Sequence, residues 1–398
     1  MTRPRFWMDS GPYELGTRMT GVGLRLWDLA GALGAQGWDV HLVSDHAGGD
    51  PPSGVTLHVG PEGRSALLED EGATLLTDLC PPSLLTALVA RERPIIVENA
   101  PPIEHLQYRE ARGRQGAAWY ADVCDLYRLQ ILCADFFLVR SSVERAAVLG
   151  SLASAGRLGT SFSRRHDFSD RVCLLPVGFA RSVEEPVTAE PWKTPTFIWN
   201  GGTWPYMRPL VPARAIGSMR SREDTRLTFL YPTGEVLATR ILAASDGKAT
   251  ILPEGPLHAD RGRYLEGALA IVVIAAGGME NATCHRLRLR DAFVFGLPVI
   301  ADNAGATGEL VERLQIGMAV EPTVRAVKSA MRAMMDAHAF EAYRANVLCH
   351  RPSFEFENNM GSLMDFLSDL AFTPARRRPA DISMARLILE RHPDWTRR

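Results

Sequence analysis

Lysine is scarce in this sequence of 398 residues. Only Lys193, Lys248 and Lys328 are present, so arginine supplies nearly all of the positive charge. Any binding site for an anion must therefore be built from arginine side chains or backbone amides. The formal net charge is −2, which excludes a strong overall field that would attract nucleic acid or an anionic membrane.

Paired cysteines are also missing. The sequence has no C-x-x-C pair, and its cysteines are widely separated: Cys80, Cys124, Cys133, Cys173, Cys284 and Cys349. This spacing argues against a disulfide framework and against a zinc site. It favours a reducing compartment, and we expect a cytoplasmic protein.

Long apolar runs are absent as well. The N-terminal stretch "MTRPRFWMDSGPYELG" lacks the apolar core of a signal peptide. No run approaches the roughly 18–20 apolar residues that a membrane helix needs. The apolar fraction of 46% is ordinary for a globular protein, and the length suits two domains. We expect a soluble protein without an integral membrane segment.

The first half of the sequence alternates strand and helix patterns. Residues 4–9 predict a buried strand, and residues 24–34 carry apolar side chains at helical spacing before an alternating strand at 40–43. Gly37 stands where a helix C-cap glycine is expected. Further strands are predicted at 73–79, 93–102 and 133–141, with a helix at 142–156. This is the pattern of a doubly wound parallel sheet.

The second half repeats that pattern, and the fold class is therefore α/β. We expect Rossmann-like domains at 1–181 and 196–350 that face one another, joined by a Pro- and Glu-rich linker at 182–195. Residues 354–372 predict an amphipathic helix within a C-terminal segment at 351–372. The basic tail at 373–398 is interpreted as solvated or partly disordered, with a patch for a partner or membrane surface as the alternative.

Five separated blocks resemble the retaining nucleotide-sugar glycosyltransferases of the GT-B fold, in particular those of family 4. The blocks are "TGVGLRLWDLAGALGAQGWDVHLVS" (20–44), "ADFFLVRSSVERAAVLGSLASAGRL" (134–158), "WNGGTWPYMRPL" (199–210), "GGMENATCHRLRLRDAFVFGLPVIADNAGATGELV" (277–311) and "IGMAVEP" (316–322). The resemblance covers most of residues 5–370. It implies a C-terminal crossover helix that packs across both domains, sugar transfer with retention of configuration, and donor departure assisted by stabilisation of the phosphates.

The segment 280–291 holds groups that suit a nucleotide-sugar donor. Two acids, Glu280 and Asp291, enclose three arginines and a histidine. We expect Glu280 at the end of a buried strand and a helix after it, capped by Asn281 or Thr283, whose amides face an anion. Arg288 and Asp291 are three positions apart, so they would share a helix face as site residues or as a simple ion pair.

The resemblance also implies a role for individual residues. Glu280 corresponds to the first acid of the family's paired-acid motif, near the transferred sugar, and Asp291 to the second, which holds the ribose. Arg286 and Arg288 match basic positions that would bind the phosphates. The remaining donor-side positions are Gly21, Gly23, Gly201, Gly202 and Arg208. No metal or other cofactor is expected, because arginines and helix amides can neutralise a diphosphate.

Two departures from the family pattern bear on function. The two acids are separated by ten residues where seven is commoner. The arginine and lysine that often follow the second domain's first strand are replaced by Gly202 and Met207, with Arg208 alongside. Arg286 or Arg288 would then carry the phosphates. The missing basic pair leaves open a non-catalytic partner subunit. A GT-B epimerase or a phosphorylase is a third alternative, although a phosphorylase needs a cofactor lysine.

The acceptor side is least defined. His105 follows a predicted strand end, where it could contact the donor sugar or orient the acceptor; a surface histidine is the alternative, and Glu98 and Glu104 lie on the same loop. Tyr13 and Arg18 would contact the acceptor or belong to a flap. A small secondary-metabolite acceptor, as in antibiotic biosynthesis, is favoured over a lipid-linked or polysaccharide acceptor, because the first domain lacks a basic amphipathic helix. The donor base, the sugar and the oligomeric state stay open.

Overall fold

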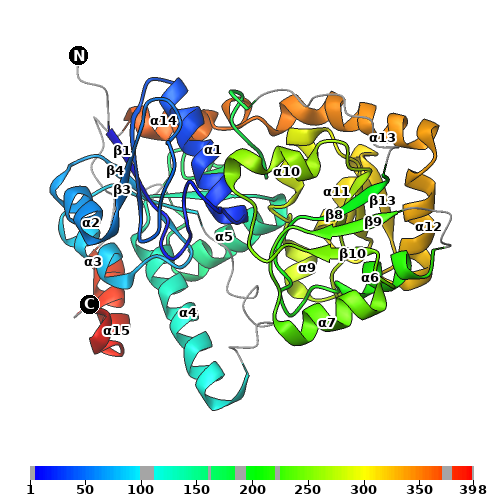
Figure 1. Cartoon of the computed structure of the whole chain (residues 1–398). Coiled ribbons are helices and arrows are strands. Elements are labelled where there is room, and N and C mark those ends of the chain that lie inside the picture. Colours follow the sequence, from blue (N-terminus) through cyan, green and yellow to red (C-terminus); the bar gives the residue numbers. More distant parts are fainter. Residues whose placement is uncertain are drawn as a thin grey trace. The chain divides into compact units, whose positions relative to one another are not determined.

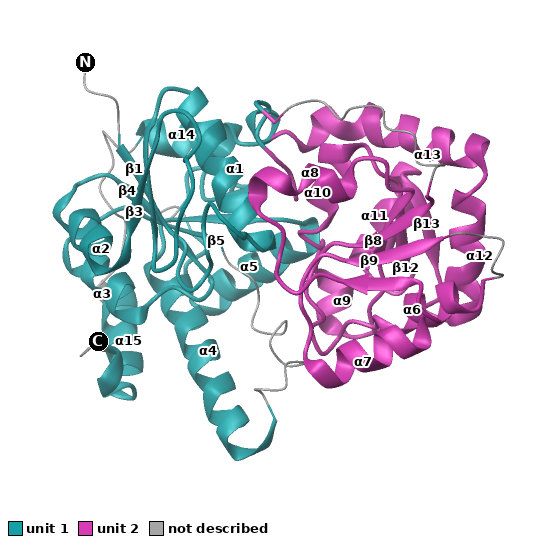
Figure 2. Cartoon of the chain, viewed as in Figure 1, with its two compact units in different colours: residues 1–176, 180–182, 356–398 teal, residues 177–179, 183–355 magenta. Residues whose placement is uncertain are grey.

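The chain folds into two compact units, coloured separately in Figure 2. The computed structural model describes residues 5–98, 112–159, 163–183, 194–219, 225–369 and 379–396. Unit 1 comprises residues 1–176, 180–182 and 356–398, and unit 2 comprises 177–179 and 183–355. The chain thus returns to unit 1 after completing unit 2. Most of the predicted linker, residues 184–193, lies outside the described residues.

Unit 1 is built on a parallel sheet of seven strands among its described residues, in the order β3-β2-β1-β4-β5-β6-β7. The strands are β1 (Arg5–Asp9), β2 (Asp39–Ser44), β3 (Val55–Val59), β4 (Ala73–Thr77), β5 (Ile95–Glu98), β6 (Phe136–Val139) and β7 (Val172–Leu174). Phe6 of the central strand pairs with Val40 on one side and Ala73 on the other. The inner strands β4 and β6 are buried along their whole length, as expected where helices cover both faces, whereas the edge strand β3 has exposed positions.

Helices of unit 1 connect these strands in sequence (Figure 1). They are α1 (Gly21–Ala35), α2 (Gly60–Glu69), α3 (Pro82–Ala90), α4 (Gly113–Cys133) and α5 (Ser142–Ser154). As predicted, α1 ends before Gly37, whose φ of 89° lies in the left-handed region. Ser141 caps α5 by accepting a hydrogen bond from the amide of Glu144.

The predicted helix at 354–372 is shorter than expected. Two 3-10 turns, Arg351–Phe354 and Phe356–Asn358, precede helix α14, which spans Gly361–Asp369. The apolar periodicity is nevertheless used, because Phe356, Met360, Leu363 and Leu367 are buried. Helix α14 belongs to unit 1.

The interpretation of residues 373–398 as a solvated tail is wrong for the described residues. Pro379–Glu390 form helix α15, which packs against α4, and the 3-10 turn Pro393–Thr396 follows it. Ala385 and Ile388 of α15 are buried in the core of unit 1. His392 contacts Asp125 of α4 at 2.9 Å. Apolar burial thus outweighs the basic composition that suggested a disordered tail.

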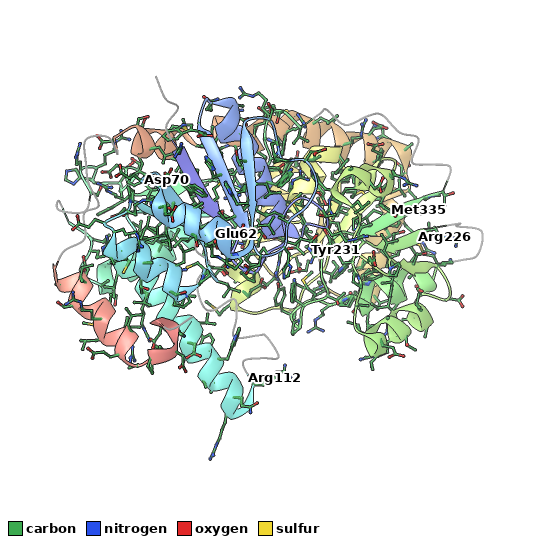
Figure 3. The ribbon with its side chains drawn as sticks, turned by 60° about the vertical axis from the view of Figure 1, so that its left-hand side comes forward. Glu62, Asp70, Arg112, Arg226, Tyr231 and Met335 are labelled. Carbon is green, nitrogen blue, oxygen red and sulfur yellow. The ribbon has the colours of Figure 1, made fainter. Side chains whose placement is uncertain are left out.

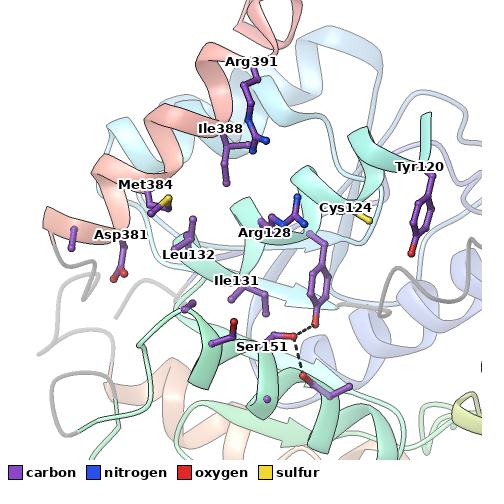
Figure 4. Close-up of a pocket in the computed structure, with 16 residues that line it drawn as sticks. Tyr120, Cys124, Arg128, Ile131, Leu132, Ser151, Asp381, Met384, Ile388 and Arg391 are labelled. Carbon is purple, nitrogen blue, oxygen red and sulfur yellow. Dashed lines mark hydrogen bonds between the residues drawn. The ribbon is translucent and has the colours of Figure 1, made fainter. Parts of the chain in front are cut away.

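A groove of 980 Å³ lies between α15, α4 and α5 (Figure 4). Its walls include Ile131, Leu132 and Met384, and Tyr127 donates or accepts a hydrogen bond with Ser151 at 2.8 Å. Among the described residues, none of those predicted to bind donor or acceptor lines this groove.

Unit 2 repeats the same topology with six described strands in the order β10-β9-β8-β11-β12-β13, all parallel. They are β8 (Thr196–Trp199), β9 (Arg226–Phe229), β10 (Ala249–Ile251), β11 (Ala270–Val273), β12 (Val299–Asp302) and β13 (Gly317–Val320). The sequential order reverses between β8 and β11, at the centre of the sheet. In doubly wound sheets, ligands bind beside the carboxyl ends of the strands at such a point.

The helices of unit 2 are α6 (Leu210–Gly217), α7 (Glu235–Ala244), α8 (Gly262–Leu265), α9 (Met279–Thr283), α10 (Leu289–Phe295), α11 (Ala306–Leu314), α12 (Val324–Met334) and α13 (Ala337–His350), with a 3-10 turn at His258–Asp260. The single helix expected after Glu280 is instead two short helices, α9 and α10. Cys284–Arg288 form the connection between them, so Arg286 lies in a loop and Arg288 immediately precedes α10. The expected cap is also wrong: Asn281 donates to Asp302, and Thr283 bonds backward to Met279.

Candidate functional site

The segments that follow β8 and β11 bring several predicted site residues together in unit 2, namely Gly201, Gly202, Glu280, Arg286, Arg288 and Asp291. Asn200–Gly202 follow β8, and the chain after β11 runs through Ile274 into α9. A backbone bridge between Met207 and Ala275 ties the two loops, and the amide of Arg208 donates to the carbonyl of Ile274 at 2.9 Å. The residues that follow these two strands therefore form one continuous surface with the α9–α10 connection.

Glu280 is buried and ion-paired. Its carboxylate accepts a hydrogen bond from NH1 of Arg286, and both side chains are at most 5% exposed. Arg286 also donates to Oδ1 of Asn281 at 2.9 Å and lies over the ring of Tyr206. Burial opposes the charged form of Arg286, but Cys284 and Glu280 outweigh it and raise its pKa. This acid and this base neutralise one another.

Thr307 fixes the loop that carries Arg286. Its hydroxyl accepts from the amide of Arg286 at 3.1 Å and donates to the carbonyl of Cys284 at 3.2 Å. Thr307 lies in the first turn of α11 and is buried. The loop geometry is thus held by side-chain bonds to the backbone, without regular secondary structure.

Arg288 is the cation of this site that has no acid partner. NH2 donates to the carbonyl of Gly202 at 3.2 Å, and the guanidinium lies over the ring of Trp199 at 5.1 Å. NH1 is buried without a hydrogen-bond partner, and no described carboxylate forms an ion pair with it. Burial, followed by the positive charge of Arg286, lowers the pKa of Arg288 to about 10. An anion bound beside Arg288 would stabilise its charged form and so oppose the effects of burial and of the positive charge of Arg286.

Gly201 makes room for this guanidinium. A Cβ atom at Gly201 would lie 2.6 Å from NH2 of Arg288. The glycine turn after β8 therefore has a specific purpose, which is to let the Arg288 side chain lie against the backbone. Gly202 contributes the carbonyl that Arg288 contacts.

Asp291 is fully enclosed by donors. Arg261 contacts both carboxylate oxygens through Nε, at 3.1 and 3.2 Å, and donates to Oδ2 through NH2. Asn200 donates to Oδ2 at 2.7 Å, and Arg290 donates to Oδ1 at 3.1 Å. Burial alone would raise the pKa of Asp291, but Arg261 and the other donors lower it. An ion pair between Arg288 and Asp291, which was the alternative to their role as site residues, is absent among the described contacts.

Arg288 differs from the other arginines of this network. Among the described contacts, Glu280 and Asp291 are the carboxylates that pair with Arg261, Arg286 and Arg290, and neither of them forms an ion pair with Arg288. His258 adds no charge at neutral pH, because burial and the nearby cations lower its pKa to about 4. Buried cations without counter-charges are unfavourable unless an anion binds. The arrangement suits a phosphate or diphosphate group.

Other predicted residues lie elsewhere. The Arg208 side chain is exposed. In unit 1, the hydroxyl of Tyr13 contacts Asp78 at 3.3 Å, and Arg18 is half-buried in the loop before α1. Gly21 begins α1, and a Cβ atom at Gly23 would lie 2.4 Å from the carbonyl of Glu14, so this glycine permits close packing of the chain on itself. His105 and Glu104 lie outside the described residues.

Sequence reasoning missed Asn200, Arg261 and Tyr231. Arg261 is 4% exposed, and its NH1 donates to the hydroxyl of Tyr231 at 2.8 Å; Figure 3 labels this tyrosine, which follows β9. Arg261 lies in a polar turn of an arginine-rich sequence, so nothing in the sequence distinguished it as a site residue. Asn200, directly after a buried strand and before two glycines, had the position of a site residue.

The described residues contain no group of three or more His, Cys, Asp or Glu side chains that could hold a metal ion. None of the described helices combines the length and the apolar character needed to cross a bilayer.

No family model matches the sequence, and no curated protein matches it significantly. Solved structures do match. HepE from Anabaena, determined with UDP-glucose, is 13% identical, with a TM-score of 0.63 over 92% of this chain and 100% of that chain. Sucrose-phosphate synthase from Thermosynechococcus elongatus is 14% identical, with a TM-score of 0.59 over 98% and 100%. A putative UDP-N-acetylglucosamine 2-epimerase from Listeria monocytogenes is 10% identical, with a TM-score of 0.53 over 93% and 97%.

These matches extend over nearly the whole of both chains, and the strand orders of the two units are those of Rossmann-like sheets. The chain therefore has the GT-B fold.

Proposed function

We propose that this protein is a glycosyltransferase that binds a nucleotide-sugar donor through the arginine network of unit 2 and transfers its sugar with retention of configuration. The acceptor is proposed to be a small metabolite. The donor is a hexose attached to a nucleoside diphosphate. The reaction is proposed to need no metal ion and to take place in the cytoplasm.

One observation carries the proposal. Arg288 is a largely buried guanidinium without a carboxylate partner, and it lies beside a second arginine at the carboxyl ends of β8 and β11. This is the edge of the sheet at which doubly wound folds bind their ligands. A diphosphate would supply the missing negative charge. HepE, which has the same fold, was determined with UDP-glucose.

Arg288 would act on the leaving group. As the bond between the sugar and the diphosphate breaks, negative charge grows on the phosphate oxygen. A guanidinium already held against Trp199 and Gly202 stabilises that charge without reorganising. Loss of one such donor in enzymes costs roughly 100- to 1,000-fold in rate.

Arg286 would have an indirect role. It occupies the carboxylate of Glu280, so Arg288 is left without an ion pair to a described carboxylate. Glu280 remains the residue proposed to lie near the transferred sugar, as its place at the start of α9 permits.

Ligand-dependent melting tests the proposal. Purified full-length protein would be heated with UDP, GDP, dTDP and their common hexose conjugates, and we expect one nucleotide series to raise the melting temperature. Arg288→Gln should abolish that shift. Arg263→Gln is the matched control, because the Arg263 side chain belongs to the same unit and is 75% exposed. Stabilisation by none of these nucleotides would contradict the proposal.

A non-catalytic partner subunit is the second candidate. The observation that favours it is that both acids are already engaged, Glu280 by Arg286 and Asp291 by Arg261. Slow release of free nucleotide from the stabilising donor would support a transferase. Binding without any turnover, with or without metal chelator, would support the partner subunit. An epimerase would instead change the sugar while it stays attached to the nucleotide.

A further inference from the structure

We infer that Asp291 is a positioning residue for Arg288 and does not bind the ribose of the donor. This inference rests on the proposed function, and it assigns to Arg261 and Asn200 a part in anion binding although neither needs to touch the ligand.

The carboxylate of Asp291 has no free acceptor position among its described contacts. An ionised carboxylate offers about four acceptor positions. The oxygens of Asp291 already accept from four N–H groups on three side chains, those of Arg261, Arg290 and Asn200, and the Nε–H of Arg261 is shared between both oxygens. The residue is 1% exposed. A ribose diol would have to displace a charge-assisted bond from an arginine, and it would replace that bond with a weaker neutral one.

Two hydrogen bonds of Asn200 connect Asp291 with Arg288. The amide nitrogen of Asn200 donates to Oδ2 of Asp291 at 2.7 Å and to the carbonyl of Arg288 at 2.9 Å. Both partners are acceptors, so the orientation of this amide is fixed. Asp291 therefore holds Asn200, and Asn200 holds the backbone of Arg288 at the turn that directs the guanidinium toward Gly201 and Gly202.

Arg261 holds Asp291 in place. It reaches Asp291 from a polar turn thirty residues earlier, is 4% exposed, and is itself held by the hydroxyl of Tyr231 at 2.8 Å. A rigid cation on the far side of Asp291 keeps the acid ionised and immobile. Without Arg261, Asp291 could move, and its hydrogen bond would no longer fix the position of Asn200.

The test compares two ligands that differ in one part. Pyrophosphate contains the phosphates alone, and a nucleoside diphosphate adds the ribose and base. Dissociation constants of both would be measured by calorimetry for full-length wild-type protein and Asp291→Asn. We expect Asp291→Asn to raise the dissociation constants of both ligands by the same factor, roughly 10-fold. A loss of affinity for the nucleoside diphosphate alone would overturn the inference, because Asp291 would then contact the nucleoside.

Asn200→Ala covers the case in which Asp291→Asn fails to fold. It cuts the path to Arg288 and leaves the pair of Asp291 with Arg261 intact. Equal loss of affinity for both ligands is expected, and unchanged affinity for pyrophosphate would overturn the inference. Arg261→Lys, which keeps the charge, should retain more affinity for pyrophosphate than Arg261→Met; equal effects of the two would count against it. If the wild type binds neither ligand, the proposed function fails and the inference falls with it.

Discussion

Arg286 and Arg288 stand two positions apart on one loop, yet only Arg286 has an acid partner. Arg286 donates to Glu280, whereas Arg288 contacts a backbone carbonyl and the face of Trp199. The positive charge of Arg286 adds to burial in lowering the pKa of Arg288. This asymmetry separates a structural arginine from one available to a ligand.

Arg288→Gln should make the ligand-free protein more stable, because it removes a largely buried cation that forms no ion pair with a described carboxylate. We expect the melting temperature of the free protein to rise by about 2–4 °C. Affinity for the stabilising nucleotide should fall roughly 10- to 100-fold. Scanning calorimetry with and without nucleotide measures both effects. A variant that melts lower and still binds would show that Arg288 stabilises the fold and does not bind the anion.

Gly201→Ala should weaken nucleotide binding with little loss of stability. The new Cβ atom would lie 2.6 Å from NH2 of Arg288, and the flexible end of that side chain can move away at small cost. The guanidinium would then leave its place beside Gly202. Gly277→Ala is the control, since a Cβ atom there meets nothing within 4 Å. Equal nucleotide affinity in both variants would argue against this purpose of Gly201.

His258 should make stability fall in mild acid. Burial, then Arg290 and Arg261, lower its pKa to about 4, against 6.5 for an ordinary histidine. Between these pH values the unfolded chain binds the extra proton, so the contribution of His258 is complete above pH 6.5 and is lost as the pH falls toward 4. The expected size is roughly 1–3 kcal/mol. Denaturant titrations of wild type and His258→Gln from pH 7 to 4 should show a flatter curve for the variant; parallel curves would exclude His258 as the source.

Ile388→Ala should destabilise unit 1. Ile388 is 4% exposed and belongs to its apolar core, so its truncation is expected to cost about 2–5 kcal/mol. Leu387→Ala, at the adjacent position with 56% exposure, should change stability by less than about 0.5 kcal/mol. Urea unfolding of both variants provides the measurement. Equal effects would mean that α15 is not packed as described.

Local patterns were enough to predict the parallel sheets. Apolar runs bounded by glycine marked β1, β2, β8 and β11, and Gly37 marked the end of α1. Strand β3 was missed, because its exposed positions and its histidine make "VTLHV" look polar. Glu280 was expected at the end of a buried strand, but β11 ends at Val273 and Glu280 lies in the first turn of α9; its role beside the donor stays a prediction.

Long-range pairing was not accessible to such reasoning. The spacing of Arg288 and Asp291 predicted a shared helix face, with an ion pair as the alternative to a binding site, but the main partner of Asp291 is Arg261, thirty residues earlier. The loop between α9 and α10 depends on a bond from Thr307, which is also distant in sequence. The C-terminal residues were misjudged because arginines and prolines at 375–379 obscured the apolar spacing of the helix that follows.

The return of the chain to unit 1 has a consequence for folding during synthesis. When residues 5–176 have been made, unit 1 still lacks the helix that carries Ala385 and Ile388, and Asp381, the partner of buried Arg157, also follows unit 2 in the chain. Unit 2 is almost contiguous in the chain and can close as soon as it has emerged. Unit 1 can therefore be completed only after unit 2 has been made, and a nascent chain stalled between unit 2 and α15 would expose an unfinished apolar surface to chaperones.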